Sequence, residues 1–292
     1  MLRARTLAAL FTLLTLTASA QTADPAQTAV ARVFHPAPPL PSYDVATIKP
    51  SVPVTGSNGM IVLSGTTVRR YIRTAFAPAS VSLAPSQVIG GPEWIDKDTY
   101  TITGKPSADL EVALRKMTND ERGVQQHMMQ QSLLADRFHL KVHSEVRVMS
   151  VYALVPAKGG LKIKEVAAPP PPDPLNPPPP LGPNAPVRPG TSMMMMSAGS
   201  RTLKAGATTM TSFVSRISTE MGDRPMIDQT GFTGYFDVEL KWAPLDSATT
   251  SDSSDLPSLA TALEETLGIK LVATKGPVEI VVIDSIDHPS EN

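Results

Sequence analysis

A proline-rich stretch in the middle of the chain limits its fold more than any other feature. The segment AAPPPPDPLNPPPPLGPNAPVRPG, residues 167–190, holds 12 of the 29 prolines in the 292-residue chain. Because proline fixes φ and lacks a backbone N–H, this segment cannot join a helix or a sheet interior. It favours extended polyproline II, at about 3.1 Å per residue. We predict that residues 167–191 link two folded units; a ligand for an SH3-type domain is the weaker interpretation.

The first residues have the order of a secretory signal peptide. Two arginines precede an apolar run, Leu7–Leu16, and small residues follow it up to Ala20. This order predicts a signal peptide over residues 1–20, with cleavage after Ala20. The run is shorter than the roughly 20 residues that span a bilayer, so we expect no stable membrane span after cleavage and a periplasmic or secreted protein. Residues 21–41, rich in Ala, Pro, Thr and Gln, suit a disordered tether.

Composition narrows the classes of function. The chain has no cysteine, so it must bury a real core to be stable without disulfides. Its 26 basic and 27 acidic residues give a formal net charge of −1, and only 5% of its residues are aromatic. Nucleic acids need a clustered positive field and often a stacking platform, so we expect no nucleic-acid partner.

The two halves of the chain repeat each other, starting with a helix. TTVRRYIRTAF (Thr66–Phe76) and TTMTSFVSRISTEMG (Thr208–Gly222) both open with Thr-Thr, a good N-cap, and then place apolar residues at helical spacing. Each is followed by Ile-Asp, at residues 95–96 and 227–228, a short polar turn and an alternating strand. The two aspartates are predicted to be turn residues that accept backbone amides.

The match continues to the end of each half. Gln131–His143 and Thr261–Ala273 both read as the end of a helix running into a strand, and after a turn comes a last apolar strand. Those last strands are Ser150–Val155 and Val278–Ile283. The leading strands are Met60–Leu63 in the first half and the methionine run Met193–Met196 in the second.

This pattern predicts the α+β class. We expect two related helix-strand-strand-helix-strand-strand units, residues 42–166 and 192–288, with helices packed on small mixed sheets and a short tail over residues 289–292. Whether the two units pack together is left open by the sequence, as is the oligomeric state.

The loop Gly90–Lys105 is rich in functional residue types but occupies a structural position in the repeat. It offers a weak candidate interaction loop formed by Trp94, Asp96, Asp98 and Tyr100. The second half keeps the Ile-Asp and the strand but lacks the Gly-Gly-Pro, which favours a turn before a half-buried strand over catalysis. We predict no catalytic, cofactor-binding or metal-binding residues.

The sequence offers little support for a metal site. His139 and His143 lie in HLKVH, which alternates like a strand and would hold two imidazoles on one face roughly 13 Å apart, too far for one ion. The run Met193–Met196 could capture Cu(I), but a strand would divide its side chains between two faces, and methionine is an ordinary core residue. The chain also lacks GxSxG, SxxK and Walker-type motifs.

Six motifs follow one another along the chain: YDVATIKPS, GGPEWIDKDTYTI, LLADRFHLKVH, VYALVPAKGGLKIKE, DQTGFTGYFDVELKW and KGPVEIVVIDSIDHPSEN. They resemble the soil-associated TIGR03435 family, also known by its domain DUF3738, with Tyr43 and Thr47 standing where the family usually has Phe and Ser. The resemblance covers nearly all of the chain after the tether and implies an exported protein with no established activity. Some relatives carry the module beside a sensor-type membrane metallopeptidase, which hints at envelope sensing.

A fainter resemblance concerns the second half, which looks like the short N-terminal domain of secretins and TonB-dependent receptors, a periplasmic docking module. That likeness concerns the fold, which does not carry its function along. Because the chain is duplicated and lacks catalytic groups, our leading hypothesis is an exported non-enzymatic module that binds an envelope protein or peptide at a sheet edge or a helix–sheet groove. The alternatives are an exported hydrolase or peptidase-associated enzyme with a site near Asp96, Asp98 and His143, and a soft-metal carrier using Met193–Met196.

Overall fold

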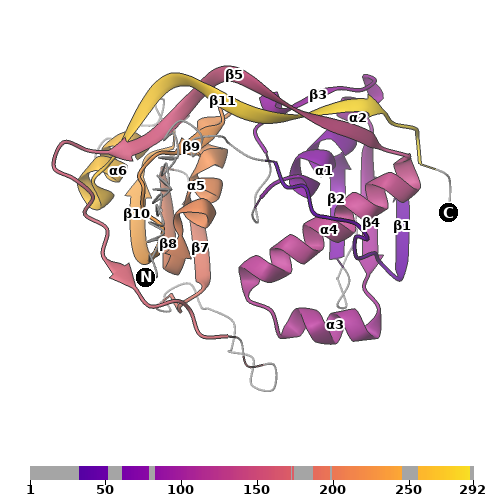
Figure 1. The fold of residues 1–292 in the computed structure, drawn as a ribbon, viewed down its shortest axis with the longest axis horizontal. Helices are drawn as coiled ribbons and strands as arrows, with labels where there is room; N and C mark the ends of the chain where they lie inside the picture. The colour runs from indigo at the N-terminus through magenta and orange to yellow at the C-terminus, as the bar shows by residue number, and fades with distance from the viewer. Residues whose placement is uncertain are drawn as a thin grey trace, which may run out of the picture.

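The computed structural model describes residues 33–51, 61–78, 83–171, 173, 187–197, 199–244 and 256–289. The predicted signal peptide and most of the proline-rich segment lie outside the described residues. Two lobes stand side by side beneath a long two-stranded ribbon (Figure 1). Residues 33–35 of the predicted tether dock on the first lobe, where Val33 is buried and the N–H of Phe34 donates to the carbonyl of Phe76 at 2.9 Å.

The first lobe is a three-stranded antiparallel sheet with helices against it. Its strand order is β1-β4-β2. The sheet comprises β1 (Val45–Pro50), β2 (Ile61–Thr67) and β4 (Thr99–Lys105). The helices are α1 (Val68–Ala75), α2 (Trp94–Lys97), α3 (Ala108–Arg115) and α4 (Asn119–Phe138).

The second lobe has a four-stranded antiparallel sheet in the order β6-β10-β8-β7. Its strands are β6 (Glu165–Val166), β7 (Thr191–Ser197), β8 (Ser200–Thr209) and β10 (Tyr235–Trp242). Its helices are α5 (Met210–Ser218), which continues into the 3-10 helix η3 (Thr219–Met221), and α6 (Leu259–Leu267).

The ribbon joins the lobes by exchanging strands between them. β5 (Lys141–Pro156) follows α4 of the first lobe, β11 (Ile269–Ser285) follows α6 of the second, and the two pair antiparallel along nearly their full length. Two short strands extend this sheet in parallel, β3 (Val88–Gly90) on β11 and β9 (Met226–Asp228) on β5; the 3-10 helix η2 (Pro85–Gln87) leads into β3. Each long strand therefore starts in one lobe and ends in the other.

The predicted α+β class is confirmed, and one detail differs. A turn was expected before each last strand, but β5 and β11 each run without a break through the expected turn. The Gly276-Pro277 pair, a typical turn signal, lies within β11 opposite Met149 and Val148. Neither β3 nor β9 pairs with the ribbon at that point, so Pro277 occupies an edge position, where proline is compatible with a sheet. Where a turn within each half was expected, β5 and β11 pair with each other across the two halves.

The repeat is visible in the element order and in local geometry. β2-α1-β3-β4-α4-β5 corresponds to β8-α5-β9-β10-α6-β11. β2 and β8 carry the same bulge, with a residue at positive φ just before the Thr-Thr pair: Gly65 at 62° and Ala207 at 44°. Thr67 and Thr209 then cap α1 and α5 with their side chains, as predicted.

Two alignments within the repeat were wrong. The counterpart of β9, which holds Ile227-Asp228, is β3, because each adds in parallel to one long strand; Ile95-Asp96 lies instead in α2. The counterpart of β2 is β8, so the methionine run forms an additional edge strand, β7. A short identical dipeptide misled the alignment because α2 is an insertion with no partner in the second half.

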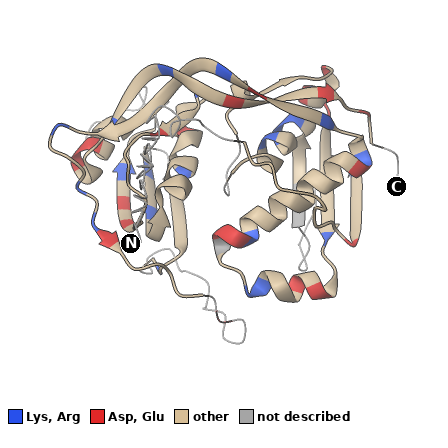
Figure 2. Cartoon of the chain, viewed as in Figure 1, with Lys and Arg blue, Asp and Glu red and all other residues tan. Residues whose placement is uncertain are grey.

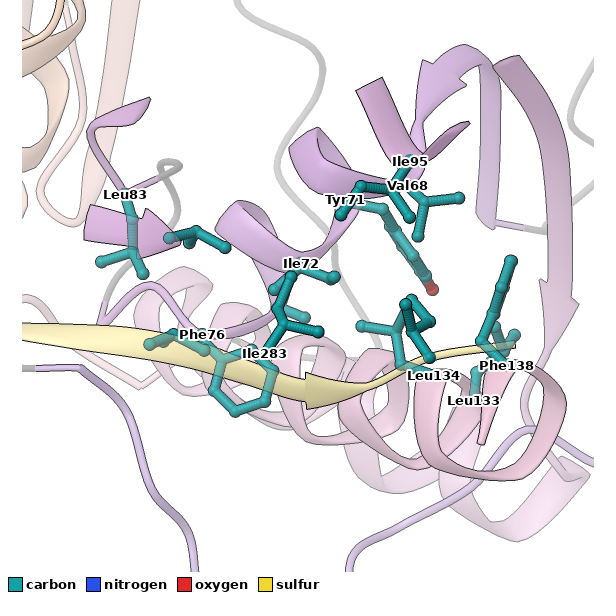
Figure 3. Close-up of a cluster of buried hydrophobic side chains, with 14 of the residues drawn as sticks. Val68, Tyr71, Ile72, Phe76, Leu83, Ile95, Leu133, Leu134, Phe138 and Ile283 are labelled. Atoms are coloured by element: carbon teal, nitrogen blue, oxygen red, sulfur yellow. The ribbon is translucent and has the colours of Figure 1, made fainter. Parts of the chain in front are cut away.

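Three buried apolar clusters hold these pieces together. The first fills the first lobe and includes Ile283 of β11, which Figure 3 shows among side chains of α1 and α4. The second fills the other lobe and includes Leu154 of β5, fully buried there. A third lies on the ribbon and includes Ile89 and Ile227 from the two short strands. Full burial of such a side chain stabilises by roughly 1.5–3 kcal/mol, so each lobe depends on a strand from the other.

Candidate functional site

The first turn of the predicted interaction loop is fixed by an arginine of α1. The guanidinium of Arg69 donates to both carboxylate oxygens of Asp96, one of them at 2.9 Å. It also donates to the carbonyl oxygens of Val88 at 3.1 Å and Gly90 at 2.9 Å, so one planar group joins α1, β3 and α2. Asp96 was predicted to accept backbone amides, and it accepts from this side chain instead. Asp228 behaves as predicted, accepting from the N–H of Thr230 at 2.9 Å.

Two other residues of the loop face the C-terminal segment. The ring of Trp94 stacks on His288 with centroids 4.0 Å apart, and Asp98 lies 3.6 Å from the same imidazole. Tyr100 is buried edge-on against Phe138, and burial raises the pKa of its phenol, with the nearby Asp98 adding to the shift. The four candidate residues thus bind other parts of this chain, and that the loop also contacts a partner stays a prediction.

The residues named for the hydrolase alternative have separate partners. Nδ1 of His143 lies 2.7 Å from Asp284 and Nε2 lies 3.2 Å from Glu145. These two bonds, the one to Glu145 first, raise the pKa of His143. Asp96 is held by Arg69 and Asp98 faces His288, and no hydrogen bond or ion pair joins any two of Asp96, Asp98 and His143.

His139 does not share a strand face with His143, which corrects the sequence interpretation. It ends α4 in the left-handed conformation, with φ 47°, and β5 begins only at Lys141. Its Nδ1 lies 3.1 Å from Asp287. Among the residues that the structure describes, no group of three or more His, Cys, Asp or Glu side chains could hold a metal ion.

The methionine strand β7 stands at the end of its sheet. Within the described ranges no strand pairs with its second edge, and in Figure 1 it is the strand of the second lobe nearest α4. Ser197 pairs with Ser200 across a two-residue connection, so this pair is expected to be hydrogen-bonded. Because hydrogen-bonded pairs alternate along an antiparallel ladder, Ser192, Met194 and Met196 present their N–H and C=O groups outward. Met196 is also 70% exposed as a whole residue.

A polar cavity of about 140 Å³ lies at the start of β7, between the two lobes. Thr191 and Ser192 of β7, Thr208 of β8, and Ser212 and Arg216 of α5 line it, and Asp120 of α4 reaches it from the first lobe. The hydroxyl of Ser212 donates to the carboxylate of Asp120 at 2.9 Å, which ties the lobes together across the cavity.

The β8 bulge forms one wall of this cavity. Ala207 sits there at φ 44°, a conformation that costs alanine roughly 1–2 kcal/mol, and its N–H donates to the carboxylate of Asp237 at 2.8 Å. A Cβ added at the neighbouring Gly206 would lie 2.7 Å from the carbonyl oxygen of Arg188, so only glycine fits. The wall is therefore held in place by backbone contacts.

Arg216 is the unpaired charge of the cavity. Within the described part of the chain its guanidinium donates no hydrogen bond and has no ion-pair partner within 4.0 Å. Burial lowers the pKa of Arg216, and the carboxylate of Asp120 partly opposes this. The sequence analysis did not identify this residue. The signal available was the spacing of Ser212 and Arg216, which are four apart on the polar side of α5, away from the buried Phe213 and Ile217.

The described helices include none that is both long enough and apolar enough to cross a membrane. Fold and sites together define a two-repeat α+β protein whose lobes exchange long strands around a polar cavity and a free sheet edge. The chain belongs to the family described as Protein of unknown function (DUF3738), whose model matches residues 69–286. No curated protein matches the chain, and no solved structure matches it.

Proposed function

We propose that the protein is an exported, non-enzymatic interaction module that binds an extended segment of an envelope protein or peptide by adding it as a strand to the outer edge of β7. The observation that carries this proposal is the composition of that edge. Sheet edges in monomeric proteins are usually guarded by charges, proline or bulges. β7 reads TSMMMMS and has none of these over seven residues.

The other edges of the lobes are guarded. β1 ends in Lys49-Pro50, β2 carries the bulge at Gly65, and β6 has only two residues. An unguarded edge that pairs with nothing in the described chain is a liability unless a partner uses it. Methionine side chains adapt to varied neighbours, which suits an edge that accepts different segments.

Export and the class of partner rest on the sequence. The predicted signal peptide supports a periplasmic or secreted location, and the resemblances to the soil-associated TIGR03435 family and to the secretin docking domain support an envelope partner. Figure 2 shows Lys and Arg interspersed with Asp and Glu over both lobes, which favours a protein partner over nucleic acid. The hydrolase alternative is less favoured because no contact joins the residues named for it.

A peptide-display selection against the mature chain tests strand addition at β7. Met196→Pro removes an outward N–H and should abolish binding of the selected peptides, whereas the matched Met196→Thr keeps that N–H and should retain binding. Circular dichroism should show both variants folded. Equal binding by the two variants would show that the peptides bind somewhere other than the β7 edge. If the selection enriches no peptide, the proposed function is wrong.

A further inference from the structure

We propose that the cavity at the start of β7 captures the free C-terminal carboxylate of the segment that adds to this strand. This inference rests on the proposed function and names the chemistry of its ligand. β7 begins at the cavity, with Thr191 and Ser192 in the wall, and ends away from it at Ser197. A segment lying along β7 therefore has one of its two ends at the cavity.

The positive charge of Arg216 determines which end of the bound segment lies at the cavity. A segment antiparallel to β7 finishes at Thr191 and brings its carboxylate there, whereas a parallel segment brings its N-terminal amine. Arg216 offers several N–H donors with no partner in the described chain, and a guanidinium matches a carboxylate in shape and charge. The hydroxyl of Ser192 lines the same space and can donate as well. The other two hydroxyls in the wall already donate to backbone carbonyl oxygens, that of Thr191 at 2.7 Å and that of Thr208 at 3.4 Å.

Asp120 is the one carboxylate in the wall and opposes an anion. It accepts from Ser212 and lies near Arg216 without pairing to it within 4.0 Å. It therefore weakens, without cancelling, the attraction of the cavity for a carboxylate. This arrangement gives two variants with opposite expected effects, since Arg216→Gln removes the attractive charge and Asp120→Asn removes the repulsive one.

The cavity also fits the size of the group. About 140 Å³ has room for a carboxylate with one or two ordered waters, since a water occupies about 30 Å³ in the liquid. It is too small for a folded element, so the rest of the ligand must lie outside it, along the β7 edge. The wall is preformed, because the β8 bulge and the Gly206 contact hold it without a ligand.

The test uses the mature full-length chain and two display libraries of random nonapeptides, one with free C termini and one with the same peptides internal to a carrier. Selected sequences are then synthesised as the free acid, the C-terminal amide and the N-acetylated acid, and their Kd values are measured by fluorescence anisotropy. We expect enrichment from the free-end library, and a loss of about 10- to 100-fold in affinity for the amide. N-acetylation should change nothing.

The variants give an independent readout. Arg216→Gln should weaken the free acid by about the same factor and leave the amide unchanged, while Asp120→Asn should tighten the free acid. Tryptophan fluorescence and thermal unfolding check that both variants fold, and Arg216→Lys should restore part of the affinity. If Arg216→Gln does not fold, the difference in affinity between the free acid and the amide, together with the effect of Asp120→Asn, still tests carboxylate capture.

The outcomes separate the two proposals. Enrichment from both libraries with equal affinity for acid and amide overturns carboxylate capture and leaves strand addition standing. If N-acetylation lowers the affinity and Asp120→Asn weakens binding, the cavity recognises an amine, and carboxylate capture is overturned. If neither library yields enriched peptides, both proposals are wrong.

Discussion

Replacement of Leu154 by alanine should destabilise both lobes equally, although its side chain is buried in only one of them. Leu154 lies on β5, which leaves the first lobe, and its fully buried side chain belongs to the core of the second. Leucine-to-alanine changes in such cores cost about 3–5 kcal/mol. If the exchanged strands make the lobes one cooperative unit, the whole molecule loses that amount.

The two tryptophans make this measurable, because each lies in a different lobe. Trp94 reports on the first lobe and Trp242, buried in the second core, reports on the second. We would follow guanidinium unfolding by fluorescence in Trp94→Phe and Trp242→Phe backgrounds, each with and without Leu154→Ala. With a slope of about 5 kcal/mol per molar for a chain of this size, both reporters should shift by roughly 0.6–1 M.

An exposed residue of the same strand provides the control for this test. Val148→Ala, on the same strand but 73% exposed, should shift neither midpoint by more than a small amount. The reasoning is refuted if Leu154→Ala moves the Trp242 transition while the transition reported by Trp94 stays in place. Such a result would mean that the lobes unfold independently and that the ribbon couples them weakly.

Three further predictions concern local structure. Ala207→Gly should raise the free energy of unfolding by up to about 1 kcal/mol, since glycine accepts φ 44° without strain, and thermal unfolding that shows a loss would contradict this. Arg69→Ala should cost about 1–2 kcal/mol in denaturant unfolding, discounted because Asp96 is half exposed; unchanged stability would show that the four bonds of the arginine contribute nothing. The folded pKa of His143 is raised, so its contribution is present below the unfolded pKa of about 6.5 and is lost as pH rises through the folded value. His143→Asn should therefore destabilise at about pH 5.5 and not at about pH 8.5, and a loss of equal size at both pH values would exclude the linkage.

The sequence predicted local structure well because local signals were strong. Thr67 and Thr209 cap their helices, and Gln131–His143 and Thr261–Ala273 each contain the predicted change from helix to strand. These features depend on a few adjacent residues, so a single sequence contains the information needed to find them.

The long-range pairing was not predictable in the same way. Nothing near Gly276-Pro277 says whether the strand turns back on itself or continues to pair with a strand from the other half, since the apolar alternation is the same in both cases. The candidate cavity was missed for a related reason: Asp120 and Arg216 are about a hundred residues apart and meet only because the lobes stand side by side. Contacts between distant segments leave no local pattern.

The exchanged ribbon also sets the order in which the polypeptide can acquire its structure. Lys141 is paired with Ser285, near the end of the described chain, and β9 pairs only with Tyr152–Leu154, so the first part of β5 has no partner until β11 has been made. A chain that crosses a membrane unfolded, from its N terminus onward, would present the first lobe outside well before β11 follows. If the protein is exported as proposed, completion of that lobe waits until β11 has crossed, and apolar residues of β5 stay unpaired in the interval.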